Sequence, residues 1–382
     1  PALPQTLPGI PLSFTGKLKN DNPYPLVGGS VYVKIFKKGG ESSLIHQNGY
    51  PMVDFFEAGK DITLAAKSEK DFTFNWQVPN SLSGGDYEAD FFFVTDHRFN
   101  LLGLSFTDDV TGNKSTFHIT SPKEHQAVFN KNAVTLNTKP YRFAAFPPHF
   151  TKDETVKAEV KLVNPSTEEK SVTLTWKLFN WDGLRTDHLL DEKTEVITLK
   201  PKETQTLSYD ATKAIGSVSY LLVDAQDGDA HSLMNIRFVR DGIPEIRLNF
   251  PSITSYPLEQ GVETHVFSCL HSTSFPVIHD NTLTLTLRDH RGKVVHTYTY
   301  TGDVTGAMMG VKDAFTPKKT LTSFSLTATL MHEGTVVDEV TQSYDCAALG
   351  AECPKKTPWL MWLALFGGIL ACAAYLRTRT KG

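Results

Sequence analysis

The chain has 382 residues, a formal net charge of −4, a hydrophobic fraction of 40% and a charged fraction of 21%. At about 100–200 residues per domain, this length predicts two to four domains. The net charge argues against a nucleic-acid-binding role, which needs a basic face, and the rest of the composition is that of an ordinary globular protein.

Short segments that alternate apolar and polar residues dominate the chain before residue 359. The clearest are residues 30–36, 156–163, 171–179 and 282–288. A period of two residues predicts strands with one buried and one solvent-facing side. Clusters of Pro, Gly, Asn and Asp separate these segments, as is typical of sandwich or barrel folds. We therefore expect an all-β fold for this part of the chain.

Glycine-containing hairpin turns recur along the chain and divide it into three similar parts. One such turn lies near each of Gly112, Gly228 and Gly334. Short linkers between the parts favour a semi-rigid rod over a flexible string. The predicted organisation is residues 1–122 as domain 1 with an insertion near 46–70, 123–241 as domain 2, 242–345 as domain 3, 346–358 as a stalk, 359–376 as a transmembrane helix and 377–382 as a basic tail.

The middle of the chain carries a recognisable strand pattern. Residues 156–176 form an alternating strand, a turn that begins at Asn164 and Pro165, and a second strand with Trp176, and residues 199–207 have the pattern of a later strand with its preceding turn. The pattern resembles the immunoglobulin-like and fibronectin-like repeats of exported, membrane-anchored surface proteins. The resemblance implies three tandem immunoglobulin-like β-sandwich domains. It is a resemblance of architecture, and a fold alone does not give a function.

The segment 359–376 carries no charge and is followed by Arg377, Arg379 and Lys381. A helix of about 18 residues spans roughly 27 Å, close to the thickness of the hydrocarbon core of a bilayer. Because the chain starts at Pro1 rather than Met, we expect an export signal to have been removed. The prediction is a single-pass protein of the cell membrane or an endomembrane. Its N-terminal domains are expected at the cell surface, in the periplasm or in a lumen, and its C-terminus in the cytoplasm.

Four cysteines leave the disulfide pairing open. Cys346 and Cys353 flank a short loop and are the favoured pair, with Cys269–Cys346 as the alternative and three unpaired thiols as a third possibility. A loop of this size would add roughly 2–3 kcal/mol at best in an oxidising compartment. Cys372 lies inside the predicted span.

Catalytic and cofactor motifs are missing from the sequence, which has no phosphate-binding glycine loop, zinc-finger spacing or nucleophile elbow. We therefore expect neither a cofactor nor a small-molecule substrate. The carboxylates of residues 224–229 offer oxygens for calcium, but the pattern favours a hairpin turn at Asp227 and Gly228. Five histidines of domain 3 are expected to be scattered rather than to form a metal site: His265, His271, His279, His290 and His296. The sequence also holds one glycosylation sequon, Asn113-Lys-Ser115.

Two segments are candidates for binding a partner. Phe91, Phe92 and Phe93 lie in an alternating strand, so their side chains point to both faces, and the second face needs a cover from the insertion or from another protein. In the predicted span, Ala364, Gly368 and Cys372 recur every four residues and form a stripe against which a second helix can pack.

These observations favour a non-enzymatic protein that binds other membrane or surface proteins. In this hypothesis the extracytoplasmic immunoglobulin-like rod mediates the interaction, and the protein is an accessory or structural subunit of a membrane or surface assembly. A carbohydrate-binding or surface-coat and adhesion protein is the alternative. A hydrolase with its site in residues 46–70 is the third hypothesis, for which the sequence offers no pair of nucleophile and base.

Overall fold

The computed structural model describes residues 4–22, 24–38, 49–95, 113–143, 147–180, 186–272, 277–306 and 308–346. The predicted transmembrane helix at 359–376, the tail at 377–382, all of the stalk except Cys346, and the candidate residues Cys353, Ala364, Gly368 and Cys372 lie outside these residues. Within the described ranges, no helix is long and apolar enough to cross a membrane.

The all-β prediction is confirmed, because nearly all the regular structure described is strand. Unit 1 comprises β1 (Gln5–Thr6), β2 (Pro11–Asn20), β3 (Leu26–Lys38), β4 (Met52–Leu64), β5 (Ser68–Gln77), β6 (Gly85–Val94) and β7 (Asn113–Ile119). Unit 2 comprises β8 (Val128–Phe129), β9 (Thr135–Leu136), β10 (Lys139–Pro140), β11 (His149–Thr151), β12 (Lys157–Val163), β13 (Lys170–Asn180), β14 (Leu189–Leu199), β15 (Thr204–Asp210), β16 (Val218–Asp227) and β17 (Ala230–Asp241), with the 3₁₀-helices η3 (Lys131–Ala133) and η4 (Thr186–His188). Unit 3 comprises β18 (Ile246–Leu248), β19 (Ser252–Ile253), β20 (Thr264–Ser272), β21 (Ile278–Asp289), β22 (Val294–Val304), β23 (Met308–Phe315), β24 (Ser323–His332) and β25 (Thr335–Asp345).

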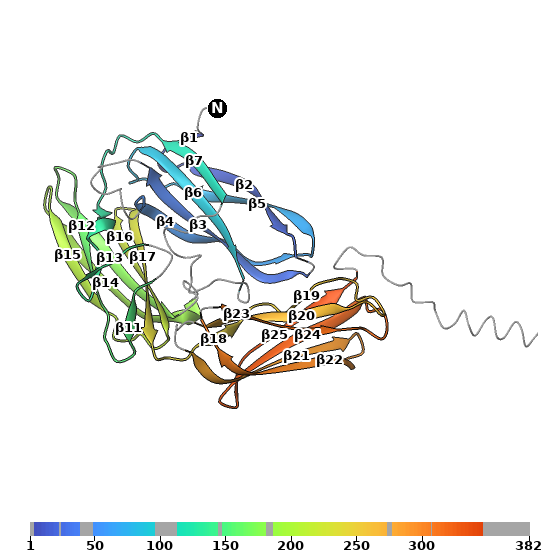
Figure 1. Cartoon of the computed structure of the whole chain (residues 1–382). Coiled ribbons are helices and arrows are strands. Elements are labelled where there is room, and N and C mark those ends of the chain that lie inside the picture. Colours follow the sequence, from blue (N-terminus) through green and yellow to red (C-terminus); the bar gives the residue numbers. More distant parts are fainter. Residues whose placement is uncertain are drawn as a thin grey trace, which may run out of the picture.

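Each unit is a pair of sheets around its own apolar core (Figure 1). In unit 1, the two-stranded sheet β2–β5 faces β1, β7, β6, β3 and β4. In unit 2, β11, β13, β14, β16 and β17 face β8, β9, β10, β12 and β15, and in unit 3 the sheet β22–β21–β24–β25 faces β18, β19, β20 and β23. In unit 2, Trp176 is fully buried and stacks on Tyr209 with ring centroids 5.4 Å apart.

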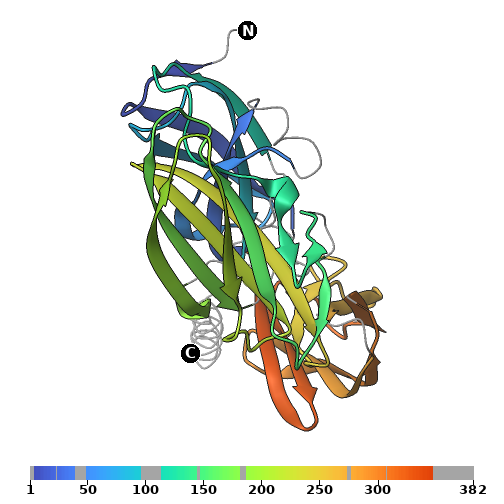
Figure 2. The same cartoon turned by 90° about the vertical axis from the view of Figure 1, so that its left-hand side faces the viewer.

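Units 1 and 2 share one sheet of ten strands. It runs β1–β7–β6–β3–β4–β17–β16–β13–β14, with β11 beside β17, and the two units meet where Met52 of β4 pairs with Leu233 of β17. Apolar side chains of both units pack together on the sheet face opposite to their own cores. They are Tyr32, Phe36, Met52 and Phe55 of unit 1 and Phe179, Tyr220 and Leu233 of unit 2. Figure 2 shows the long strands of unit 2 beside unit 1.

The segment predicted as an insertion in domain 1 belongs to the sandwich. Residues 52–64 form β4, which pairs along its length with β3, and β5 begins at Ser68. The register between β3 and β4 shifts at several points. Such shifts are typical of β-bulges, where one strand has an extra residue. Residues 52–64, which the sequence assigns to an insertion, are therefore a strand of the sandwich.

The three units do not form the predicted rod. The ring of Tyr24, just before β3, lies 5.9 Å from the ring of Phe250 and 6.2 Å from that of Tyr344, both in unit 3. Gln342 of β25 also donates a hydrogen bond to the carbonyl oxygen of Pro25 at 3.4 Å. Unit 3 therefore packs back against unit 1, as Figure 1 shows.

Replacing Tyr24 by Ala is expected to loosen the packing of unit 3 on unit 1. The substitution removes both aromatic pairs and the burial of the tyrosine ring, which together stabilise this packing by about 1–2 kcal/mol. We expect a larger radius of gyration in small-angle X-ray scattering of the full chain in detergent. Tyr300→Ala is the control, because the Tyr300 hydroxyl donates to the Asp303 carbonyl inside unit 3. Equal radii for the two variants and the wild type would contradict the prediction.

Candidate functional site

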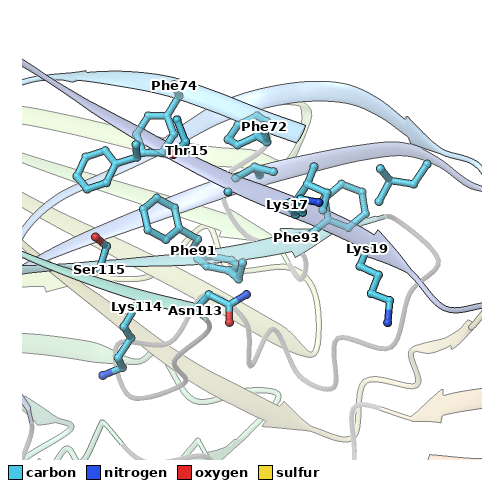
Figure 3. A pocket seen from close by; sticks show the side chains of 16 residues that line it. Thr15, Lys17, Lys19, Phe72, Phe74, Phe91, Phe93, Asn113, Lys114 and Ser115 are labelled. Atoms are coloured by element: carbon cyan, nitrogen blue, oxygen red, sulfur yellow. The ribbon is translucent and has the colours of Figure 1, made fainter. Parts of the chain in front are cut away.

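A cleft of about 560 Å³ opens between the two sheets of unit 1 (Figure 3). It lies within the size range of ligand-binding pockets, about 300–1,000 Å³. Its apolar lining comes from both sheets. The lining includes Phe14 and Leu18 of β2, Phe72 and Phe74 of β5, and Val31, Leu64, Phe91 and Phe93.

An aromatic cluster forms the closed end of the cleft. Phe14 stacks on Phe74 with centroids 5.0 Å apart, and Phe91 lies edge-on to both at 5.4 and 5.5 Å. Phe117 closes the cluster, 5.6 Å from Phe14. Aromatic pairs in these geometries stabilise each other by about 0.5–1.5 kcal/mol beyond their buried area. The cluster is therefore a rigid wall and belongs to the core of unit 1.

The three consecutive phenylalanines of β6 point to two different places. Phe91 and Phe93 line the cleft, and both are only partly buried. Phe92 also borders the cleft, but its ring packs on the opposite face of the sheet, stacked on Tyr32 at 5.7 Å, with Lys34 Nζ 4.6 Å from its ring centroid. The sheet face that carries Phe92 is therefore covered in part by the apolar cluster that units 1 and 2 share. Partner binding by these residues stays a prediction.

The gap in the lining is centred on Gly16 of β2. The inward-facing positions of β2 alternate, so Gly16 lies between Phe14 and Leu18. A Cβ atom at Gly16 would meet no heavy atom within 4 Å. The missing side chain leaves a space where the core of unit 1 would otherwise continue. This glycine therefore helps to keep the cleft open.

The rim of the cleft is basic. Lys17, Lys19 and Lys114 line it, and none of the lining residues that the structure describes is acidic. Each lysine pairs with a carboxylate outside the cleft: Glu69 at 3.4 Å, Asp21 at 3.0 Å and Glu88 at 2.5 Å, respectively. The hydrogen bond to Asp21 raises the pKa of Lys19. Water screens the exposed pairs of Lys17 and Lys19, which contribute little to stability, so these two lysines can exchange partners. Lys114 is held by Glu88, whose side chain is buried.

The residues of the predicted sequon also line the cleft. Asn113 and Ser115 lie at the start of β7, where Phe91 pairs with Asn113 and Ala89 with Ser115. They continue the inward-facing row that includes Phe117. The polar pair therefore forms one wall of the mouth of the cleft, opposite β2 (Figure 3).

The carboxylates of residues 224–229 form a hairpin turn, as the sequence predicts. The turn joins β16 to β17, and Gly228 has φ = +71°, which favours glycine. Asp227 accepts from Lys170 Nζ at 2.6 Å, and Asp229 accepts from the amide of Ser81 at 2.6 Å. Asp224 pairs with His231 at 3.0 Å and raises the pKa of that imidazole. Each carboxylate therefore binds a different protein group.

The histidines of unit 3 have separate surroundings. His279 pairs with Asp303 at 2.9 Å, and His296 pairs with Asp313 at 2.7 Å while stacking on Phe315. Burial, with a smaller contribution from Arg247, lowers the pKa of His271 to about 4. Among the residues that the structure describes, no group of three or more His, Cys, Asp or Glu side chains is placed to hold a metal ion.

Two of the cysteines lie in the described residues. Cys269 on β20 is a free thiol, and burial raises its pKa. This argues against the alternative pair Cys269–Cys346. Because Cys353 lies outside the described residues, the pair Cys346–Cys353 stays a prediction.

Comparisons with known proteins identify no family for the chain. No family model matches the chain, and no curated protein matches it. Among solved structures, it is similar to trypsin-activated α2-macroglobulin from Escherichia coli, with 14% identity over 88% of this chain and 22% of that chain and a TM-score of 0.32. For the native conformation of E. coli α2-macroglobulin, the identity is 13% over 92% of this chain and 22% of that chain, with a TM-score of 0.32. For red sea bream transglutaminase, the identity is 12% over 52% of this chain and 30% of that chain, with a TM-score of 0.28. The chain thus spans less than a third of the length of these proteins, and similarity at these scores carries no argument about activity.

Proposed function

We propose that this chain is a non-enzymatic interaction protein whose unit 1 binds a partner protein through the Phe-lined cleft. In this proposal it is an accessory or structural subunit of a membrane or surface assembly. The uncharged segment 359–376 anchors it as a single-pass helix, the described units are extracytoplasmic, and the stripe of Ala364, Gly368 and Cys372 contacts a second helix.

The cleft is the observation that carries this proposal. It has an apolar floor, a polar wall of Asn113 and Ser115, and a rim with three lysines. Apolar cores with polar rims are typical of protein interfaces. Carbohydrate sites, by contrast, commonly use Trp or Tyr, whose polar edges phenylalanine lacks, and neither is among the described residues that line this cleft.

Purification of the full chain from its native membrane in mild detergent tests the proposal. We expect a second polypeptide to co-elute in stoichiometric amount, and Gly16→Leu to lower its yield at least about tenfold by filling the cleft. The matched control is Gly310→Leu on β23, because a Cβ atom at Gly310 also meets no heavy atom within 4 Å. Absence of any stoichiometric partner, or equal loss in both variants, would overturn the proposal.

A further inference from the structure

Two strand edges flank the cleft and lack partners along part of their length. Among the described residues, β2 pairs only with β5. On its outer side β7 pairs with β1, but only at His118 and Ile119. The outer edge of residues 113–117 therefore has no strand partner in the part of the chain that the structure describes. Such an edge is a ready template for another strand.

The core of unit 1 is divided at the same place. Phe14, Phe74 and Phe91 belong to one apolar cluster, and Leu18 and Phe93 pack with a second. Gly16 lies between them with open space in front of it. Among the described residues, the sandwich therefore has neither a strand along this edge nor the side chains that such a strand would insert.

We propose that the cleft binds an extended segment of a partner polypeptide, which adds a strand along residues 113–117 of β7 and inserts apolar side chains beside Gly16. Alternate side chains of a strand lie about 7 Å apart on one face, so the five residues of this edge accommodate two or three of them. A strand added at this edge continues the sheet of β7 and places alternate side chains in the space beside Gly16. A helix bonds its backbone groups internally and offers none to this edge.

Charge selects the flanks of the bound segment. Among the described residues, the lining of the cleft contains Lys17, Lys19 and Lys114 and no acidic residue. Lys17 and Lys19 form exposed pairs with Glu69 and Asp21 outside the cleft, whereas Lys114 pairs with the buried Glu88. A segment with acidic residues on either side of its apolar positions therefore complements the rim. Strand addition of this kind takes affinity from backbone hydrogen bonds and specificity from alternate side chains.

Defined peptides test this mode of binding on the full chain in detergent. The probe is a fluorescein-labelled pool of peptides of about nine residues with apolar residues at alternate positions and Asp at both ends. A second pool has the same composition with the apolar residues adjacent. Fluorescence anisotropy is expected to show at least about tenfold tighter binding of the alternating pool. Methylation of every second backbone nitrogen, on the edge that faces β7, is expected to remove this difference.

Variants assign the binding to the cleft. Gly16→Leu is expected to weaken binding of the alternating pool at least about tenfold, and Gly310→Leu to leave it unchanged. Charge reversal by Lys17→Glu with Lys19→Glu, which also breaks the exposed pairs with Glu69 and Asp21, is expected to weaken the Asp-flanked pool and to strengthen a Lys-flanked pool. Equal binding of the alternating and adjacent pools would overturn the strand mode, as would insensitivity to Gly16→Leu.

The strand mode rests on the proposed function, and the experiments distinguish a failure of one from a failure of the other. If a native partner is lost with Gly16→Leu while the peptide pools bind equally, the proposed function stands and the strand mode is overturned. A dimer of the chain in sedimentation velocity that Gly16→Leu dissociates would also overturn it, in favour of a second copy of the chain as occupant. Displacement of the peptides by laurate with no difference between the pools would overturn it in favour of an acyl chain.

Discussion

Replacing Asp227 by Ala is expected to lower the free energy of unfolding by about 3–5 kcal/mol, the usual cost of removing one partner of a buried ion pair. Asp227 is buried, and its carboxylate accepts from Lys170 Nζ at 2.6 Å and from the amide of Ala127 at 3.0 Å. Burial alone would raise the pKa of Asp227, but the hydrogen bond from Lys170 and its other contacts outweigh burial and lower it. Without Asp227, the Lys170 ammonium remains in a site where its side chain is only 10% exposed.

Urea unfolding of the full chain, followed by tryptophan fluorescence, measures this cost. Lys170→Met is the informative companion, because it removes the cation and keeps an apolar stem of similar length. Asp227→Ala combined with Lys170→Met is expected to be more stable than Asp227→Ala alone. A loss below about 1 kcal/mol for Asp227→Ala would show that water screens the pair as it does on a surface.

The strands could be read from the sequence because their burial alternates. Residues 282–288, predicted as a strand, lie inside β21, whose Leu283, Leu285 and Leu287 are fully buried while the threonines between them are half-exposed. Residues 156–163 correspond to β12 and residues 171–179 to β13. The pleated backbone of a strand points successive side chains to opposite faces, so alternation of apolar and polar residues in the sequence directly predicts a strand with one buried face.

The packing of the three units against one another could not be predicted from this alternation. The bridge between Met52 and Leu233 and the contact of Tyr24 with Phe250 join residues that are far apart in the chain. Both strands of the bridge have apolar residues on two faces, which a single-sequence pattern assigns equally well to a deep core or to a partner. A rod and a folded-back arrangement therefore give the same sequence pattern.

The sequence indicated only some of the residues that line the cleft. Phe91 and Phe93 signal an excess of aromatic surface, and the structure places them at an opening between two sheets. Gly16 was missed, although a glycine at the inward position between Phe14 and Leu18 was the available signal. An absent side chain becomes informative only when the register of β2 against β5, with Gly16 opposite Phe72, is known.

The contact between the turn of unit 2 and unit 1 depends on one carboxylate. Asp229 accepts from the amide of Asn80 at 2.7 Å, from its Nδ2 at 2.8 Å and from the amide of Ser81 at 2.6 Å. Partial burial on its own would raise the pKa of Asp229, but the hydrogen bonds from Asn80 and Ser81 outweigh it and lower the pKa to about 2. Asp229 therefore joins the two units in its ionised form.

Replacing Asp229 by Ala is expected to weaken this contact by about 2 kcal/mol, since bonds to a charged acceptor are each worth about 1.5–3 kcal/mol when shielded and less at a partly exposed site. The folded-state pKa lies below the ordinary value of 3.8, so the stabilisation is present above pH 4 and is lost as the pH falls through about 2. The wild-type chain is therefore expected to lose stability between pH 4 and pH 2 more steeply than Asp229→Ala in urea unfolding. Asp303→Ala, at an exposed aspartate paired with His279 in unit 3, is the control and is expected to keep the wild-type slope. Identical slopes for Asp229→Ala and the wild type would show that the carboxylate does not hold the two units together.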